Sequence, residues 1–292
     1  MRENICTVCP RMCGVDRNRS VGFCGAPSGL KVALVKKHFG EEPIISGTKG
    51  SGTIFFSHCN LKCVFCQNYE ISSEGKGKRI SVARLVEIFK ELEQSGVHNI
   101  NLVSPSQYAM QLLEAFKIYK PKIPVVYNTN GYDDVDTLKL LAPYIDIYLT
   151  DLKFCDSDLS KKYCNCSNYF EVATRAIKQM RLNASQDIIE NGIMKRGVIV
   201  RHLVMPDCTN DSIKVLNWIE DNLGKDTIVS LMCQYVPYYK SCEFSEINRT
   251  LKPLEYKRVY NYMVKLGLDN GYCQQLDSAT TEEIPSWTGE GV

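Results

Sequence analysis

The sequence lacks the long apolar runs and the charge excess that define several large protein classes. No apolar run approaches the roughly 20 residues that a membrane-spanning helix needs. The formal net charge at pH 7 is only +2 over 292 residues, so the composition gives no reason to expect nucleic acid or an acidic membrane surface as a partner. We therefore expect neither a membrane nor a nucleic acid among the partners of this chain.

Several familiar motifs are missing as well. The chain has no Gly-x-Gly-x-x-Gly dinucleotide loop, no phosphate-binding Gly-Lys-Ser/Thr and no Gly-x-Ser-x-Gly nucleophile elbow. No sequence repeat of 20 to 50 residues is evident. The first residues, from Met1 to Cys6, carry no apolar signal region, so we expect a cytoplasmic location.

Cysteine, in contrast, is abundant, with 14 residues in the chain. A reducing compartment disfavours disulfides, so clustered cysteines there point to metal, and a thiol-rich chain of this kind suits an anaerobic or well-reduced cell. The cysteines of the later part are scattered, and we expect most of them to be small core residues or bystanders. They are Cys155, Cys164, Cys166, Cys208, Cys233, Cys242 and Cys273.

Three cysteines, Cys59, Cys63 and Cys66, follow an apolar run at 53–56 that predicts a strand. Three thiolates on one tight loop can hold three corners of a cubane [4Fe-4S] cluster. A fourth cysteine at matching spacing is absent, so one iron would stay open to a small molecule. Zinc or packing thiols are the alternatives, but zinc usually takes four closed ligands.

The pattern Cys-x3-Cys-x-aromatic-Cys after a first strand, with Phe65 as the aromatic residue, resembles the signature of radical S-adenosylmethionine (SAM) enzymes. Further segments resemble the branch of pyruvate formate-lyase activating enzyme, within residues 50–275. They are Gln67-Asn68-Tyr69, Asn128-Thr129-Asn130-Gly131-Tyr132, Asp151-Leu152-Lys153 and Arg201-His202-Leu203-Val204. The resemblance implies SAM on the open iron and its reductive cleavage to methionine and a 5′-deoxyadenosyl radical. It also implies a reductant such as flavodoxin or ferredoxin as a partner.

Apolar periodicity predicts six strand–helix units in regular alternation. The strands are expected at 53–56, 100–103, 125–127, 145–149, 197–200 and 228–232, and the helices at 82–92, 110–116, 135–141, 172–180, 212–223 and 253–267. This alternation is typical of parallel strands with right-handed crossovers. The predicted fold class is α/β, a partial (β/α)6 TIM-like barrel of the radical SAM type with a Cys-rich amino-terminal extension. We expect the Cys-rich segment at 1–50, the barrel at 51–275 and a tail at 276–292.

The amino-terminal segment carries a second cysteine group at Cys6, Cys9, Cys13 and Cys24. Little apolar content surrounds these thiols, so a metal would explain how the segment is ordered. Structural zinc in a closed four-sulfur site is the first choice, an accessory iron–sulfur cluster is the second, and reduced thiols or a disulfide remain. Residues 30–35 alternate like a strand of a small accessory sheet, and we expect this segment to lie next to the cysteine loop at 59–66.

The predicted strand ends supply further candidate cofactor contacts, because ligands of such barrels bind at the carboxyl ends of the strands. The candidates in and after the first three strands are Phe65, Asn68, Ser104, Ser106, Asn128 and Asn130. Ser104 and Ser106 stand where relatives commonly hold a Gly-Gly-Glu motif for the methionine amino group, and Ser106 could equally be a helix N-cap. The amides of Asn128 and Asn130 suit ribose hydroxyls, with a turn as the alternative role of Asn130.

Asp151 and Lys153 alternate onto one face of the fourth strand end. The resemblance places them at the cofactor, where Lys153 and Arg201 would meet the SAM carboxylate. His202 points away from Arg201 and is either a structural histidine or a ligand contact. Gln234 and Tyr235 are candidate substrate contacts.

Two enzymatic functions are compatible with these residues. One is activation of a glycyl radical enzyme, in which the radical abstracts hydrogen from a glycine of a partner protein. The other is radical modification of a small molecule or of another peptide. A non-catalytic iron–sulfur or zinc protein is the third hypothesis, which a failure to cleave SAM would favour.

Overall fold

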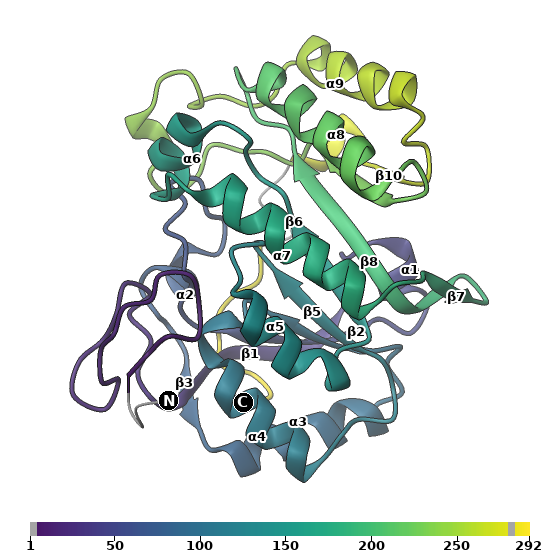
Figure 1. Ribbon diagram of the computed structural model, residues 1–292. Coiled ribbons are helices and arrows are strands. Elements are labelled where there is room, and N and C mark those ends of the chain that lie inside the picture. Colours follow the sequence, from purple (N-terminus) through teal and green to yellow (C-terminus); the bar gives the residue numbers. More distant parts are fainter. Residues whose placement is uncertain (1–4, 280–283) are drawn as a thin grey trace.

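A parallel sheet forms the centre of the computed structural model, which describes residues 5–279 and 284–292 (Figure 1). Six parallel strands pair in chain order, and they match the six predicted strands. They are β2 (Ser51–Phe56), β4 (Ile100–Val103), β5 (Val125–Thr129), β6 (Ile147–Asp151), β8 (Ile193–Leu203) and β9 (Ile228–Met232). A further parallel strand that was not predicted, β10 (Gly271–Cys273), extends the sheet beyond β9. The result is the expected α/β fold with a partly open parallel sheet.

The other edge of the sheet is antiparallel. The strand β1 (Leu30–His38) pairs with β2, and β3 (Lys78–Ile80) pairs with β1. The expectation of a separate accessory sheet is therefore wrong, because β1 continues the main sheet. A short strand, β7 (Ile188–Glu190), forms a hairpin with the start of β8.

Helices follow the parallel strands and cover the outer face of the sheet (Figure 1). The longer ones are α3 (Val82–Gln94), α4 (Ala109–Ile118), α5 (Val135–Leu141), α6 (Ser157–Cys164), α7 (Tyr169–Asn183), α8 (Thr209–Leu223) and α9 (Pro253–Leu266). The helix α6 was not predicted, because it is short and has few apolar residues. It nevertheless carries a start signal, since the carboxylate of Asp156 accepts hydrogen bonds from the backbone N–H groups of Asp158 and Leu159.

Single turns complete the fold. They are the α-helical α1 (Pro43–Ser46) and α2 (Tyr69–Ser72) and the 3₁₀ turns η1 (Ser106–Tyr108), η2 (Ala142–Tyr144), η3 (Ser241–Glu243) and η4 (Leu276–Ser278). None of the helices in the described part of the chain is long and apolar enough to cross a membrane.

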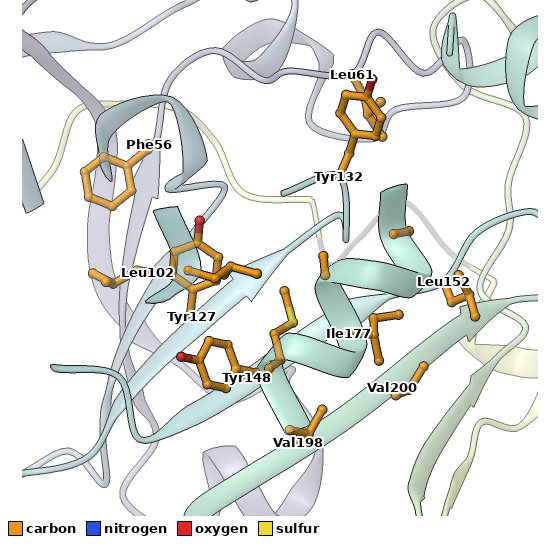
Figure 2. Close-up of a cluster of buried hydrophobic side chains, with 14 of the residues drawn as sticks. Phe56, Leu61, Leu102, Tyr127, Tyr132, Tyr148, Leu152, Ile177, Val198 and Val200 are labelled. Atoms are coloured by element: carbon orange, nitrogen blue, oxygen red, sulfur yellow. The ribbon is translucent and has the colours of Figure 1, made fainter. Parts of the chain in front are cut away.

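The outer face of the sheet forms the main hydrophobic core with the helices. Alternate residues of β5, β6 and β8 point to this side, among them the fully buried Tyr127, Tyr148 and Val198 (Figure 2). Ile177 of α7 packs in the same cluster. Because these residues take one side of each strand, the intervening residues face the interior of the partial barrel.

A small second core closes the amino-terminal end of that interior. The turn α1 inserts Ile44 and Ile45 against inward-facing residues of the strands. These are Val126, Ile147, Leu149, Met194, Ile199 and Ile228. The interior is therefore apolar at its base, and its polar residues lie toward the carboxyl ends of the strands.

The carboxyl-terminal tail lies along the antiparallel edge of the sheet (Figure 1). The indole of Trp287 is buried, with its ring 5.4 Å from that of Phe55. The carbonyl of Glu290 accepts a hydrogen bond of 3.0 Å from the backbone N–H of Val35. Residues 284–292 thus cover the sheet, whereas residues 280–283 of the predicted tail lie outside the described residues.

We predict that Ile45→Ala lowers the free energy of unfolding by about 2–5 kcal/mol, because Ile45 is fully buried in the core at the barrel base. Urea denaturation with a matched exposed control, Ile118→Ala, measures this effect. Ile118 is 62% exposed, so its replacement should change the value by no more than about 0.5 kcal/mol. Equal effects of the two substitutions would contradict a packed base of the barrel.

Candidate functional site

A cavity of about 540 Å³ opens at the carboxyl ends of the parallel strands. Its lining includes Cys63 and Cys66 from the loop after β2, Asp151 and Lys153 from the end of β6, and Arg201 from β8. Parallel pairing brings these segments together, since the carboxyl ends of neighbouring strands meet at one edge of a sheet. The predicted cysteine loop and the predicted charged strand ends therefore share one cavity.

The cysteine loop is held in place by hydrogen bonds to its sulfurs and its backbone. The side chain of Asn130 donates to Cys59 Sγ over 3.2 Å, and the backbone N–H of Leu61 donates to the same sulfur over 3.4 Å. The sulfur of Cys66 lies 3.2 Å from the hydroxyl of Ser72. Such polar contacts stabilise a thiolate and orient it.

The end of α6 packs against the same loop. The backbone N–H of Val64 donates to the carbonyl of Tyr163 over 2.9 Å. The thiol of Cys164 lies 3.3 Å from Cys63 Sγ. Cys164 was predicted to be a core residue or a bystander, and it is indeed buried, but it also contacts a candidate iron ligand.

The thiols of the loop have raised pKa values. Burial raises the pKa of Cys59 to about 12 and that of Cys66 to about 11, and the contact with Cys164, followed by burial, raises the pKa of Cys63. A bound iron would supply the positive charge that lets such thiols ionise. Within residues 5–279 and 284–292, no three His, Cys, Asp or Glu residues are grouped to hold one metal ion. A cubane cluster does not require three thiolates to meet at one metal ion, because each thiolate binds a different iron.

Two cations and two carboxylates form a buried network beside the loop. Asp151 Oδ2 lies 2.5 Å from Lys153 Nζ, and Asp151 Oδ1 lies 2.8 Å from Arg201 Nε. Arg201 also lies 3.4 Å from the carboxylate of Glu41 and donates to the side-chain oxygen of Asn128 over 2.6 Å. Burial alone would raise the pKa of Asp151, but the two cations outweigh it and hold this pKa below its usual value.

Glu41 and Glu42 are functional candidates that the sequence did not reveal. Glu41 accepts hydrogen bonds from the side chains of Asn101 and Asn128 at 2.8 and 3.1 Å, and both glutamates line the cavity. Burial raises the pKa of each. Glu42 Oε2 is buried and has no hydrogen-bond partner among the described residues. Nothing in the local sequence marks Glu41 and Glu42 as cavity residues. They reach the cavity only because the chain passes below the sheet on its way from β1 to β2.

The remaining predicted residues divide into two groups. Phe65, Asn68, Gln234 and Tyr235 line the cavity, and the rings of Phe65 and Tyr235 pack 6.1 Å apart. Because the hydroxyl of Tyr235 donates to the carbonyl of Ile247, this tyrosine does not offer its hydroxyl to a ligand.

Five predicted site residues do not line the cavity: the cluster ligand Cys59 and the four contacts Ser104, Ser106, Asn130 and His202. The hydroxyl of Ser106 donates to Asp133 over 2.5 Å, and the backbone N–H of Ser104 donates to the carbonyl of Asn128 over 2.9 Å. Asn130 contacts the cysteine loop from outside the cavity. His202 lies on the opposite face of β8 from Arg201, buried, with Nδ1 2.7 Å from the carbonyl of Leu152. Alternation along the strand explains why only one of these two neighbours reaches the cavity.

The fold and the cysteine loop define a class of enzyme, and the comparison with protein families names it. The family model described as the radical SAM superfamily matches residues 53–219, more than half of the chain. The chain belongs to the radical SAM superfamily. Membership implies a [4Fe-4S] cluster, SAM and a reductant.

Two relatives come from Methanocaldococcus jannaschii. The uncharacterized protein MJ0674 is 34% identical over 275 residues, covering 90% of this chain and 75% of the relative. The uncharacterized protein MJ0808 is 23% identical over 256 residues, covering 80% of this chain and 71% of the relative. Their names describe no activity.

Solved structures of SuiB from Streptococcus suis share the fold. The structure bound to the precursor peptide SuiA has a TM-score of 0.50 at 15% identity, over 74% of this chain and 46% of SuiB. The structure bound to S-adenosylmethionine has a TM-score of 0.50 at 17% identity, over 74% of this chain and 48% of SuiB. This chain thus matches less than half of SuiB, and the similarity concerns the fold alone.

We predict that Arg201→Ala lowers the free energy of unfolding by about 3–5 kcal/mol, because it leaves the buried carboxylates of Asp151 and Glu41 short of a cation. Denaturant unfolding measures the change. The control is Arg175→Ala, which removes a 64% exposed arginine paired with Glu171 and should have an effect within about 0.5 kcal/mol. A loss no larger than that of the control would mean that the network contributes little to stability.

His202 should affect the pH dependence of stability rather than the reaction. Burial lowers its pKa from 6.5 to about 4, so the unfolded chain binds this proton first and the folded protein loses stability as pH falls from about 6.5 to 4. One pKa unit corresponds to about 1.4 kcal/mol. We expect His202→Asn to flatten this part of the stability profile, measured by urea unfolding from pH 4 to 8. An unchanged profile together with a loss of SAM cleavage at pH 7.5 would instead assign His202 to the chemistry.

Proposed function

We propose that this chain cleaves SAM at a [4Fe-4S] cluster held by Cys59, Cys63 and Cys66 and abstracts hydrogen from a substrate. The observation that carries the proposal is the single cavity shared by Cys63, Cys66 and the charged ends of β6 and β8. When bound, the reduced cluster supplies the electron that splits SAM into methionine and a 5′-deoxyadenosyl radical. Flavodoxin or ferredoxin would be a suitable reductant.

The side chains of this cavity have complementary tasks. Lys153 and Arg201 are the two cations beside the cysteine loop, and they would bind the SAM carboxylate. Asn128 lies at the end of β5, where its amide would meet a ribose hydroxyl. Asp151 fixes both cations by its two oxygens, so it acts as a positioning residue for them. The apolar rings of Phe65 and Tyr235 would exclude water from the reacting atoms.

The substrate has two candidates. The order of the motifs along the chain favours a glycine of a glycyl radical enzyme, as in the branch that the sequence resembles. The tail favours a small molecule or a peptide side chain, because Ile284 and Pro285 line the cavity and narrow the space for a protein loop. A volume of about 540 Å³ falls in the range typical of small-molecule sites, and SAM must share it.

We predict that the anaerobically reconstituted and reduced chain forms 5′-deoxyadenosine from SAM. Cys59→Ala, Cys63→Ala and Cys66→Ala should each lower the rate to that of reductant without protein, since an incomplete ligand set cannot hold the cluster. Chromatography of the reaction mixture measures the product. Cys242→Ala is the matched control, because Cys242 is exposed and should be replaceable without effect. Undiminished product formation in all three loop variants would refute the cluster assignment.

A glycyl radical enzyme with deuterium-labelled glycine distinguishes the two proposed kinds of substrate. Transfer of deuterium from a glycine of a glycyl radical enzyme to 5′-deoxyadenosine, together with a protein-based radical signal, would support activation. Product formation without transfer from any such protein would favour the small-molecule or peptide reaction.

A further inference from the structure

A row of paired residues on neighbouring strands lines the cavity with two kinds of side chain. Strand register pairs Asp151 of β6 with Arg201 of β8, Arg201 with Ser230 of β9, and Ser230 with Tyr272 of β10. All four residues line the cavity. One half of the row is therefore charged, and the half on β9 and β10 offers only a serine and a tyrosine.

Glu41 interacts with the charged half of this row. Its carboxylate lies 3.4 Å from Arg201 and accepts hydrogen bonds from the side chains of Asn101 and Asn128. Arg201 lies 2.8 Å from Asp151 on its other side. In the described part of the chain, the ion pairs of Arg201 thus join it to Asp151 and Glu41.

Glu42 lies beside the other half of the row. It lines the cavity and is only 9% exposed, and its Oε2 atom has no hydrogen-bond partner among the described residues. Burial raises the pKa of Glu42, and Arg201 and a hydrogen bond from Ser230 offset part of this effect. Burial, followed by the charge of Glu42, raises the pKa of Tyr272. The carboxyl group of Glu42 is therefore near Ser230 and Tyr272, with one oxygen that no donor contacts.

A protonated amine has the properties that complement this oxygen. A buried carboxylate is stable when a cation and N–H donors contact it. The cavity shows the effect at Asp151, because two cations hold its pKa below the usual value although burial alone would raise it. An ammonium group at Glu42 would act in the same way, since it brings both a positive charge and N–H donors.

The place of Glu42 in the barrel favours the substrate over SAM as the source of that amine. Glu42 directly precedes α1, whose residues Ile44 and Ile45 close the base of the barrel. Its carboxyl group therefore lies toward the inner end of the cavity. SAM, in the proposed function, binds at the cysteine loop and Lys153, near the carboxyl ends of the strands.

We propose that Glu42, assisted by the hydroxyl of Ser230, binds a protonated amine of the substrate at the inner end of the cavity. The inference rests on the proposed function and specifies its substrate as a free primary amine or a peptide side chain that carries one. A backbone glycine has no such group. The inference therefore favours the small-molecule or peptide reaction over activation of a glycyl radical enzyme.

The experiment compares two probes of similar size, n-butylammonium and n-butanol, by ligand-observed NMR titration of the reconstituted full chain. We expect the unchanged chain to bind butylammonium about tenfold more tightly than butanol, because a charge-assisted contact contributes that much. Glu42→Gln should bind the two probes about equally, with circular dichroism confirming that it is folded. Glu171→Gln is the matched control, because Glu171 is 71% exposed on α7, and it should keep the preference.

A second pair of probes distinguishes the two sources of the amine. Lysine and norleucine, each blocked at its amino and carboxyl ends, differ by the charged group of the side chain. Tighter binding of blocked lysine than of butylammonium would support a peptide side chain, and weaker binding would support a free amine. These titrations require neither SAM nor an electron, so their result can be read even if the chain does not cleave SAM.

Three results would overturn the proposal. The first is equal affinity of the unchanged chain for butylammonium and butanol, which requires no variant. The second is a preference for butylammonium that Glu42→Gln keeps or that Glu171→Gln loses equally, because the cation would then bind elsewhere. The third comes from a titration with SAM: if Glu42→Gln weakens SAM binding more than butylammonium binding, the carboxyl group serves the ammonium group of SAM instead.

Discussion

The parallel pairing of β6 with β8 is the constraint on which the site depends. It sets Asp151 opposite Arg201, and Lys153 follows two residues later on the same side. A carboxylate between two cations is stable in a buried position because each charge has a partner with good geometry. Asp151 thereby keeps the cations Lys153 and Arg201 at the edge of the cavity, where an anionic group of a ligand can contact them. A shift of one residue in this register would send Arg201 to the outer core and bring His202 inward.

The rest of the interior follows from the two-sided nature of the strands. Large residues such as Tyr127 and Tyr148 occupy the outer face under the helices (Figure 2), and polar residues such as Asn128 and Arg201 line the inner face near the strand ends. The turn α1 fills the base with the apolar side chains of Ile44 and Ile45. Glu41 and Glu42 stand immediately before this turn. The same short segment that closes the barrel therefore also supplies the acidic part of the cavity.

The sequence predicted what depends on local pattern and spacing. The three cysteines, the six parallel strands and the side of Asp151 and Lys153 all follow from spacing or period. It could not predict Glu41, since its place depends on the path between two strands that pair in an antiparallel way. Ser106 was misplaced for a similar reason, because its hydroxyl bonds to Asp133, a partner that only the folded chain brings within reach. The start of helix α6 could have been predicted from the sequence, because Asp156 is a residue type favoured at the N-cap.

Neutral amide side chains donate hydrogen bonds within the cysteine loop, and this has a consequence for the electrochemistry of a bound cluster. Asn60 donates to the carbonyl of Tyr132 over 2.6 Å, and Asn130 donates to both Asn60 and Cys59. Hydrogen bonds to cluster sulfurs stabilise the reduced, more negative state and raise the reduction potential. Arg11 of the amino-terminal segment donates to the backbone carbonyl of Asn60, whereas the side-chain amide of Asn60 bonds to Tyr132 and Asn130. The amino-terminal segment therefore contacts the residue that follows Cys59 in the chain, and it lies against the cysteine loop.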